Sequence, residues 1–274
     1  MTRATRSPRR RDRAGVPLAL VPPALIGAAF LLLPTVALLI RMPWSGLREL
    51  YSDSNVSAAL TLSLQTATAA TIASLLFGVP LAWMLARLRF RGLGLIRAAV
   101  TMPLVLPPVV GGVSLFLALG RFGVVGRYLD RWFGFTLPFT KYGVVAAETF
   151  VAMPFLVITA EGAFRAADRR LEEAAATLGA SRLTVFWRVT LPGIGPSLVA
   201  GTVLCWARAL GEFGATITFN GSLPGKTEVM PTKISLALET SPEQAEALSL
   251  ILIAIALVIL AALREQWLRP AVSS

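Results

Sequence analysis

The hydrophobic residues of this chain gather in long uncharged runs and do not alternate with polar residues. Residues 17–40 contain no charged side chain in 24 positions. As an α-helix rising about 1.5 Å per residue, this run reaches about 36 Å, which exceeds the about 30 Å of a bilayer's hydrocarbon core. The pattern therefore predicts a helix that spans a membrane.

Six apolar runs of sufficient length predict an all-α, polytopic membrane protein with about six transmembrane helices. The run from 54 to 86 holds 33 residues without a charge, so its helix is expected to tilt or to begin outside the membrane near Asn55. An even number of spans leaves both termini on one side. The candidate spans are residues 17–40, 57–86, 98–120, 142–161, 194–219 and 246–263.

Basic residues are distributed unevenly between the loops, which sets the orientation. Of the 26 Lys and Arg residues, 17 fall on the side of the N-terminus, 8 on the other side, and Arg208 lies inside a span. Excess Lys and Arg mark cytoplasmic loops, so both termini are predicted to be cytoplasmic. The asymmetry accounts for the net charge of +11 without a nucleic-acid partner. The tail with Arg9, Arg10, Arg11 and Arg13 is expected to be solvated beside anionic membrane lipid.

Residues that bind metals or form disulfides are scarce. The chain has no histidine, and Cys205 is its only cysteine. An intrachain disulfide is therefore impossible. A transition-metal site with the usual nitrogen and sulfur ligands is not expected either.

Two loops on the side away from the termini have distinctive patterns. Residues 121–141 mix charged and aromatic side chains, which predicts a short amphipathic segment at the membrane interface. Residues 220–227 nearly match a phosphate-binding loop, but Asn220 stands where the first glycine belongs. We interpret this second stretch as an external turn.

The loop between the fourth and fifth spans predicts two short helices. Alanine, leucine and glutamate favour the first helix, Gly179 is suited to its end, Ser181 can cap the second, and Pro192 lies near the close. Four residues fall on one face of the first helix at helical spacing: Leu171, Ala174, Ala175 and Leu178. This shallow apolar face either docks a partner or packs on the protein's own surface.

The sequence Glu-Ala-Ala at 173–175, followed by Gly179 and by Val189, Leu191 and Pro192, resembles the EAA signature of bacterial ABC importer permeases. Valine stands at 189, where that family commonly has isoleucine. The resemblance implies a type I ABC importer permease-like fold and a coupling loop that fits into a groove on a cytoplasmic ATPase. The coupling residues that it implies are Glu172, Glu173, Ala174, Ala175, Leu178 and Gly179.

Two further stretches narrow the family. Together with the coupling loop, residues 102–112 and 207–216 resemble the molybdate/tungstate permeases, close relatives of the sulfate permeases, and the resemblance covers residues 57–264. It implies a homodimer that works with two cytoplasmic ATPase subunits and an external binding protein for a tetrahedral oxyanion. ATP and Mg²⁺ are then bound by the ATPase, and this chain carries no cofactor and no catalytic residue.

Three prolines are expected to break the third span. Pro103, Pro107 and Pro108 fall within six residues, and irregular backbone inside a membrane is tolerated only where it is buried in protein or lines a watered cavity. We therefore expect these prolines beside the translocation path. The alternative is a kink that only shapes packing.

The fifth span carries two opposite charges, Arg208 and Glu212, four residues apart. An intramembrane charge costs at least about 2.5 kcal/mol, so the two are expected to pair. The pair either holds helices together or contacts the anion. Thr216, one turn further, offers its hydroxyl to the anion or to its own backbone carbonyl. Within the resemblance, the third and fifth spans line the path and its gate, whereas Glu148 is expected near the outer interface without a role.

The predicted protein is a multi-pass permease of the bacterial inner membrane. Import of sulfate or thiosulfate remains an alternative, and so does a secondary transporter or channel without an ATPase, which the coupling loop disfavours. A non-transporting scaffold is a third class. The predicted divisions are a basic tail (1–16), the first span and external loop (17–56), a core domain (57–264) containing the coupling loop (164–193), and a C-terminal tail (265–274).

Overall fold

The computed structural model describes residues 18–41 and 54–267, which fold into helices with no β-strand among them. They belong to two units, Met1–Met42 and Pro43–Ser274. The expected basic tail at 1–16, most of the first external loop, and residues 268–274 lie outside the described residues. Among the described helices, four are long and apolar enough to cross a membrane, and a pair of helices bent by 75° supplies a further candidate.

The described part of the first unit is one apolar helix. A 3₁₀ turn, η1 (Leu18–Leu20), leads into α1 (Val21–Arg41), which has 21 residues and a mean hydropathy of 2.3. At about 1.5 Å per residue its length is about 32 Å, so it matches the first predicted span. None of its residues is buried within the chain, and a helix that is apolar on all sides is suited to lipid.

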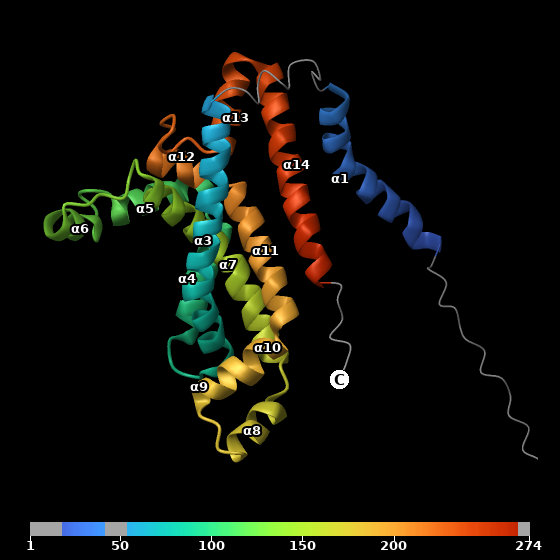
Figure 1. The fold of residues 1–274 in the computed structure, drawn as a ribbon, viewed down its shortest axis with the longest axis vertical. Helices are drawn as coiled ribbons and strands as arrows, with labels where there is room; N and C mark the ends of the chain where they lie inside the picture. The colour runs from blue at the N-terminus through green and yellow to red at the C-terminus, as the bar shows by residue number, and fades with distance from the viewer. Residues whose placement is uncertain (1–17, 42–53, 268–274) are drawn as a thin grey trace, which may run out of the picture. The chain divides into compact units, whose positions relative to one another are not determined.

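The core of the second unit is formed by α3 (Ser54–Arg87), α7 (Lys141–Ala166) and α11 (Gly195–Leu210), which pack along one another (Figure 1). The helices α3 and α7 match the second and fourth predicted spans. At one end of this unit, α13 (Met230–Thr240) turns into α14 (Pro242–Trp267), which matches the sixth.

Small side chains let α3 and α7 approach closely. Ala67, Ala70 and Ala152 are fully buried in the contact, and such residues are typical of helix packing in membranes, where the backbones come near each other. Larger buried side chains, Leu85 and Phe164, fill the contact at the end where α3 finishes. Leu156 and Val157 of α7 are buried against α3 as well, so larger side chains fill the contact beyond this end.

The third predicted span is broken into α4 (Leu93–Val105) and α5 (Pro108–Leu119), with Leu106 and Pro107 extended between them. Two consecutive prolines cannot donate the helical hydrogen bonds, so the predicted break is confirmed and the second piece restarts with proline in its first turn. The predicted amphipathic segment is present as α6 (Gly126–Phe133), which exposes Trp132 and Phe133.

The fifth predicted span, 194–219, is also interrupted, and here the expectation of one continuous helix was wrong. The helix α11 ends at Leu210, and α12 (Gly214–Asn220) begins after three intervening residues. The physical reason is local: Glu212 accepts a hydrogen bond from the backbone N–H of Ala215 at 2.9 Å. This carboxylate satisfies an N–H group at the start of α12 and so stabilises a new helix start.

The broken pieces α5 and α12 pack so closely that glycine is required between them. A Cβ atom on Gly112 would lie 2.6 Å from the Cβ of Thr218 and 2.9 Å from the carbonyl oxygen of Ala215. A Cβ atom on Gly214 would lie 2.6 Å from the Cβ of Pro108. The two interrupted spans can thus approach each other closely only because glycine occupies positions 112 and 214.

We expect Gly112→Ala to lower the free energy of unfolding by about 1–3 kcal/mol, because a methyl group forced into this contact moves backbone as well as side chains. Thermal unfolding of the purified protein in detergent measures the effect. Gly162→Ala on α7 is the matched control, since no atom lies within 4 Å of the added Cβ. Equal unfolding temperatures for the two variants would contradict the close contact.

Candidate functional site

A helical hairpin of residues 168–193 lies at the end of the second unit where α3 finishes, opposite α13 (Figure 1). It covers the loop between the fourth and fifth predicted spans. Its elements are α8 (Arg169–Thr177), α9 (Arg182–Val185), the π-helix η3 (Phe186–Thr190) and α10 (Leu191–Gly193).

Local capping explains the shape of the 168–193 hairpin. The carboxylate of Asp168 accepts a hydrogen bond from the N–H of Arg170 at 2.9 Å and caps α8. Gly179 has φ +87°, a left-handed conformation that favours glycine just after a helix. The Ser181 hydroxyl accepts from the N–H of Thr184 at 3.2 Å and caps α9. The predicted roles of Gly179 and Ser181 are confirmed.

The apolar face of α8 is not packed on the protein's own surface. Leu171 is 62% exposed and Leu178 is 89% exposed. In the second half of the hairpin, Leu183 and Trp187 are exposed as well. Of the two interpretations left by the sequence, the geometry favours a face that docks a partner, because large exposed apolar patches mark interaction sites.

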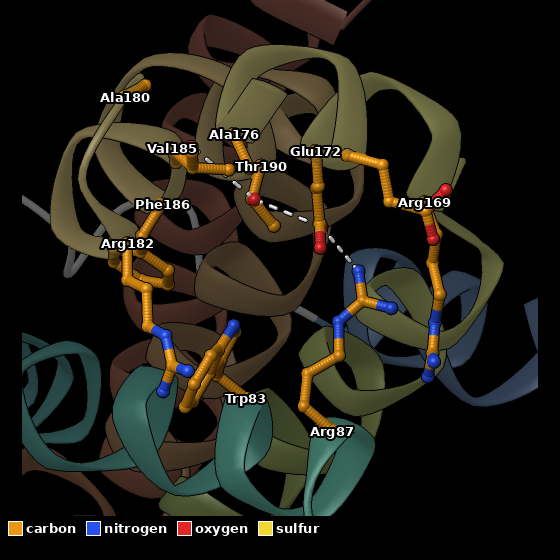
Figure 2. A pocket seen from close by; sticks show the side chains of 11 residues that line it. Trp83, Arg87, Arg169, Glu172, Ala176, Ala180, Arg182, Val185, Phe186 and Thr190 are labelled. Atoms are coloured by element: carbon orange, nitrogen blue, oxygen red, sulfur yellow. Dashed lines mark hydrogen bonds and ion pairs between the residues drawn. The ribbon is translucent and has the colours of Figure 1, made fainter. Parts of the chain in front are cut away.

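The two glutamates of α8 have different surroundings. Glu172 accepts hydrogen bonds from Arg87 at 2.5 Å and from the Thr190 hydroxyl at 3.0 Å (Figure 2). Glu173 is exposed and forms no side-chain hydrogen bond or ion pair with the other described residues. Both line a cavity of about 330 Å³ between α3 and the hairpin, together with Trp83. Glu172 is therefore engaged in contacts within the protein, whereas Glu173 is available to a partner.

A second cavity, of about 150 Å³, brings together residues from both broken spans. Pro103 and Pro108 line it with Phe150 of α7 and with Arg208. Arg208 forms the predicted ion pair with Glu212, at 2.6 Å, and its side chain stays 29% exposed while that of Glu212 is 1% exposed. One cationic side chain thus faces a cavity next to the proline-containing break.

Two other expected path residues lie apart from this cavity wall. Pro107 is the residue before α5 and is not among the residues that line the cavity. Thr216 is fully buried in α12, and its hydroxyl has no hydrogen-bond partner among the described residues. Of the two alternatives for this hydroxyl, the bond to its own backbone carbonyl is therefore not formed.

A buried carboxyl group was missed by the sequence interpretation. Glu148, expected near the outer interface, lies in the first half of α7 and is 1% exposed, so neighbouring helices cover it. It accepts a hydrogen bond from the hydroxyl of Thr66 in α3 at 2.9 Å, and its other oxygen has no partner among the described residues. An ionisable group at such a place in a spanning helix is a functional candidate by default. In the sequence, the only indication of this buried carboxyl group was a possible partner, Thr66, in the neighbouring apolar run.

The stretch 220–227 has the geometry of a closed turn. The Thr227 hydroxyl donates to the carbonyl oxygen of Asn220 at 3.2 Å and accepts from the N–H of Leu223 at 3.0 Å. In a phosphate-binding loop that hydroxyl would be free for a metal ion. The observed bonds agree with the interpretation of this stretch as a turn.

Comparison with known sequences places the chain among transport proteins. Residues 78–274 match the family model described as "Binding-protein-dependent transport system inner membrane component". The chain is 48% identical over 234 residues to the molybdenum transport system permease protein ModB of Mycobacterium tuberculosis, covering 85% of this chain and 88% of that protein. ModB of Escherichia coli K12 is 42% identical over 210 residues, with 77% and 92% covered. The sulfate transport system permease protein CysT of the same organism is 36% identical over 255 residues, with 92% of each covered.

Solved structures share the fold. A chain of a bacterial ABC transporter that imports the acidic polysaccharide alginate superposes with a TM-score of 0.71 at 22% identity, covering 93% of this chain and 95% of that one. A chain of the alginate transporter in complex with a pentasaccharide-bound periplasmic protein gives 0.72 at 20% identity, covering 92% and 93%. The predicted all-α, type I importer permease fold is confirmed.

Proposed function

The chain belongs to the family of binding-protein-dependent transport system inner membrane components, and we propose that it is the permease subunit of an ATP-driven importer of molybdate or tungstate. The observation that carries the coupling part is the exposed apolar face of α8, with Glu173 beside it. The choice of anion is supported by 48% identity to a molybdenum permease against 36% to a sulfate permease.

The importer that we propose contains two copies of this chain, two cytoplasmic ATPase subunits and an external binding protein. The family description names a binding protein, and one solved relative is seen with a periplasmic one. The ATPase subunits bind ATP and Mg²⁺, so this chain carries no cofactor. Glu173, Ala174, Ala175, Leu178 and Gly179 form the surface offered to the ATPase.

The proposed orientation places the 168–193 hairpin and both termini in the cytoplasm. The predominance of Lys and Arg on the side of the N-terminus supports it. The turn before α13 then lies outside the cell, at the opposite end of the second unit (Figure 1). An external binding protein and a cytoplasmic ATPase would thus meet different ends of the same helices.

We propose that the anion passes the cavity lined by Pro103, Pro108 and Arg208. A guanidinium group attracts a dianion, and the N-terminal end of α5 beside it adds positive potential. The ion pair with Glu212 offsets part of the charge of Arg208, which favours passage over tight retention. Pro107 and Thr216 are proposed as supporting residues of the same path, in the break and in α12.

Deleting the gene is expected to lower cellular molybdenum in cells grown on scarce molybdate, and a wild-type copy should restore it. Inductively coupled plasma mass spectrometry of washed cells measures the metal, and uptake of labelled sulfate in the same strains is the control. If molybdenum is unchanged while sulfate uptake falls, the anion is sulfate. If neither changes, the importer proposal itself is wrong.

A further inference from the structure

One carboxylate oxygen joins three elements at the base of the hairpin. Oε1 of Glu172, on α8, accepts from Nη2 of Arg87, the last residue of α3, and from Oγ1 of Thr190, the last residue of η3 (Figure 2). The first bond links the hairpin to a spanning helix. The second bond links its first helix to its second half.

This contact is largely shielded from water. The Arg87 side chain is 9% exposed, that of Glu172 is 23% exposed, and Thr190 is buried. A shielded ion pair is screened much less by salt and water than a surface pair, so the attraction between its charges is stronger. The Arg87–Glu172 bond is therefore a firm attachment between α8 and the end of α3.

Among the described residues, the Arg87–Glu172 contact is the one ion pair that joins the first half of the hairpin to a spanning helix. Within the described residues, the backbone of α8 packs mainly against α9 and η3. The second half is held differently: the ring of Phe186 in η3 contacts Trp83 of α3 and Phe164 of α7 at centroid distances of 6.2 Å. Aromatic packing thus fixes the second half, and the charged contact fixes α8.

The Arg87 guanidinium is incompletely satisfied. Its Nε and Nη1 atoms are buried and have no hydrogen-bond partner among the described residues. Buried donors are nearly always paired in native proteins, and exceptions ask for an explanation. Arg87 also lines the cavity of about 330 Å³ between α3 and the hairpin, which gives its side chain room to exchange partners.

We propose that Arg87 is a positioning residue that passes movement of α8 to α3 through Glu172. This inference rests on the proposed importer function and deepens it. The family resemblance places Glu172 among the residues that face the ATPase, but the geometry turns it inward and leaves Glu173 for the partner. The helix α3 then carries the displacement to α11, to which Thr68 is bonded through the indole N–H of Trp206 at 3.3 Å.

The test compares Arg87→Gln with Arg87→Lys in the complete importer, reconstituted in proteoliposomes with ATPase subunits and anion-loaded binding protein. Uptake of anion per ATP hydrolysed is measured at equal amounts of assembled complex. Arg87→Gln should lower this ratio about tenfold, as expected for loss of a coupling contact. Arg87→Lys keeps the charge and should restore most of it. Arg89→Gln, an exposed arginine two residues on, is the matched control.

The outcomes separate the two proposals. If the wild-type complex shows no ATP-dependent uptake, the proposed function fails. If the wild type transports and Arg87→Gln keeps the same ratio, the coupling inference is wrong. It is also wrong if Arg87→Gln only reduces the yield of assembled complex, so that uptake and hydrolysis fall by the same factor, because that pattern indicates a purely structural role. A third contradicting result is an uptake ratio for Arg87→Lys that is no higher than the ratio for Arg87→Gln.

Discussion

Glu212→Ala is expected to destabilise the protein and to abolish transport. The substitution leaves Arg208 without its partner at 2.6 Å and removes the acceptor that caps α12 through the Ala215 N–H. Breaking a buried ion pair typically costs about 3–5 kcal/mol, and because Arg208 is 29% exposed we expect about 3 kcal/mol. Uptake should be lost because the α11–α12 junction and the cavity beside it lose their shape together.

Thermal unfolding in detergent and anion uptake measure these two effects. Glu212→Gln separates their causes, since the amide oxygen can still accept from Ala215 but cannot neutralise Arg208. The double variant Arg208→Ala/Glu212→Ala should be less destabilised than the sum of the single variants. Glu239→Gln, on the exposed surface of α13, is the control. An unchanged unfolding temperature for Glu212→Ala would contradict the structural role of the pair.

Glu173→Lys is expected to abolish ATP-driven uptake without impairing membrane insertion. Glu173 is exposed beside the apolar face of α8, so its replacement should change stability by less than about 0.5 kcal/mol. At a docking surface that is complementary to the glutamate, however, reversal of its charge places like charges together, which costs several kcal/mol. Uptake in cells, with the amount of protein in the membrane measured by immunoblot, tests this.

The matched control for that variant is Glu239→Lys, which makes the same change on α13 at the opposite end of the second unit (Figure 1). It should leave ATPase binding unchanged. Co-purification of the ATPase with each variant then shows where the defect arises. Normal uptake by Glu173→Lys would exclude the proposed ATPase-facing surface and would favour a protein without a coupled ATPase.

Features that depend on nearby residues were predictable from the sequence. Uncharged runs located the long helices because bilayer thickness fixes their length. Consecutive prolines located the break before α5, and Gly179 with Ser181 located the turn of the hairpin, because φ and capping are properties of one or two residues. The Arg208–Glu212 pair was predictable for the same reason, since the two residues are four apart.

Features that depend on packing between distant segments could not be predicted in this way. The bond from Thr66 to Glu148 joins residues 82 apart, and the bond from Arg87 to Glu172 joins residues 85 apart. No local pattern indicates such pairs. The burial of Glu148 could not be predicted because a hydrophobic run gives the length of a helix but not which of its faces is covered.

The interruption between α11 and α12 was missed for a different reason. Residues 207–216 contain no proline, and the apolar composition continues across Gly211 and Gly214. The break depends on a side chain that bonds to the backbone three residues further on, from Glu212 to Ala215. Side chains of this kind compete with the helix locally, and composition alone does not show which arrangement wins.

The packing between α3 and α7 makes this pair of helices one stiff unit. Small side chains such as Ala67 and Ala152 bring the backbones close together, and Leu156 fills the space between them. The buried bond from Thr66 to Glu148 ties the two helices through polar groups as well. A displacement applied at the hairpin end would therefore move both helices together as a single lever.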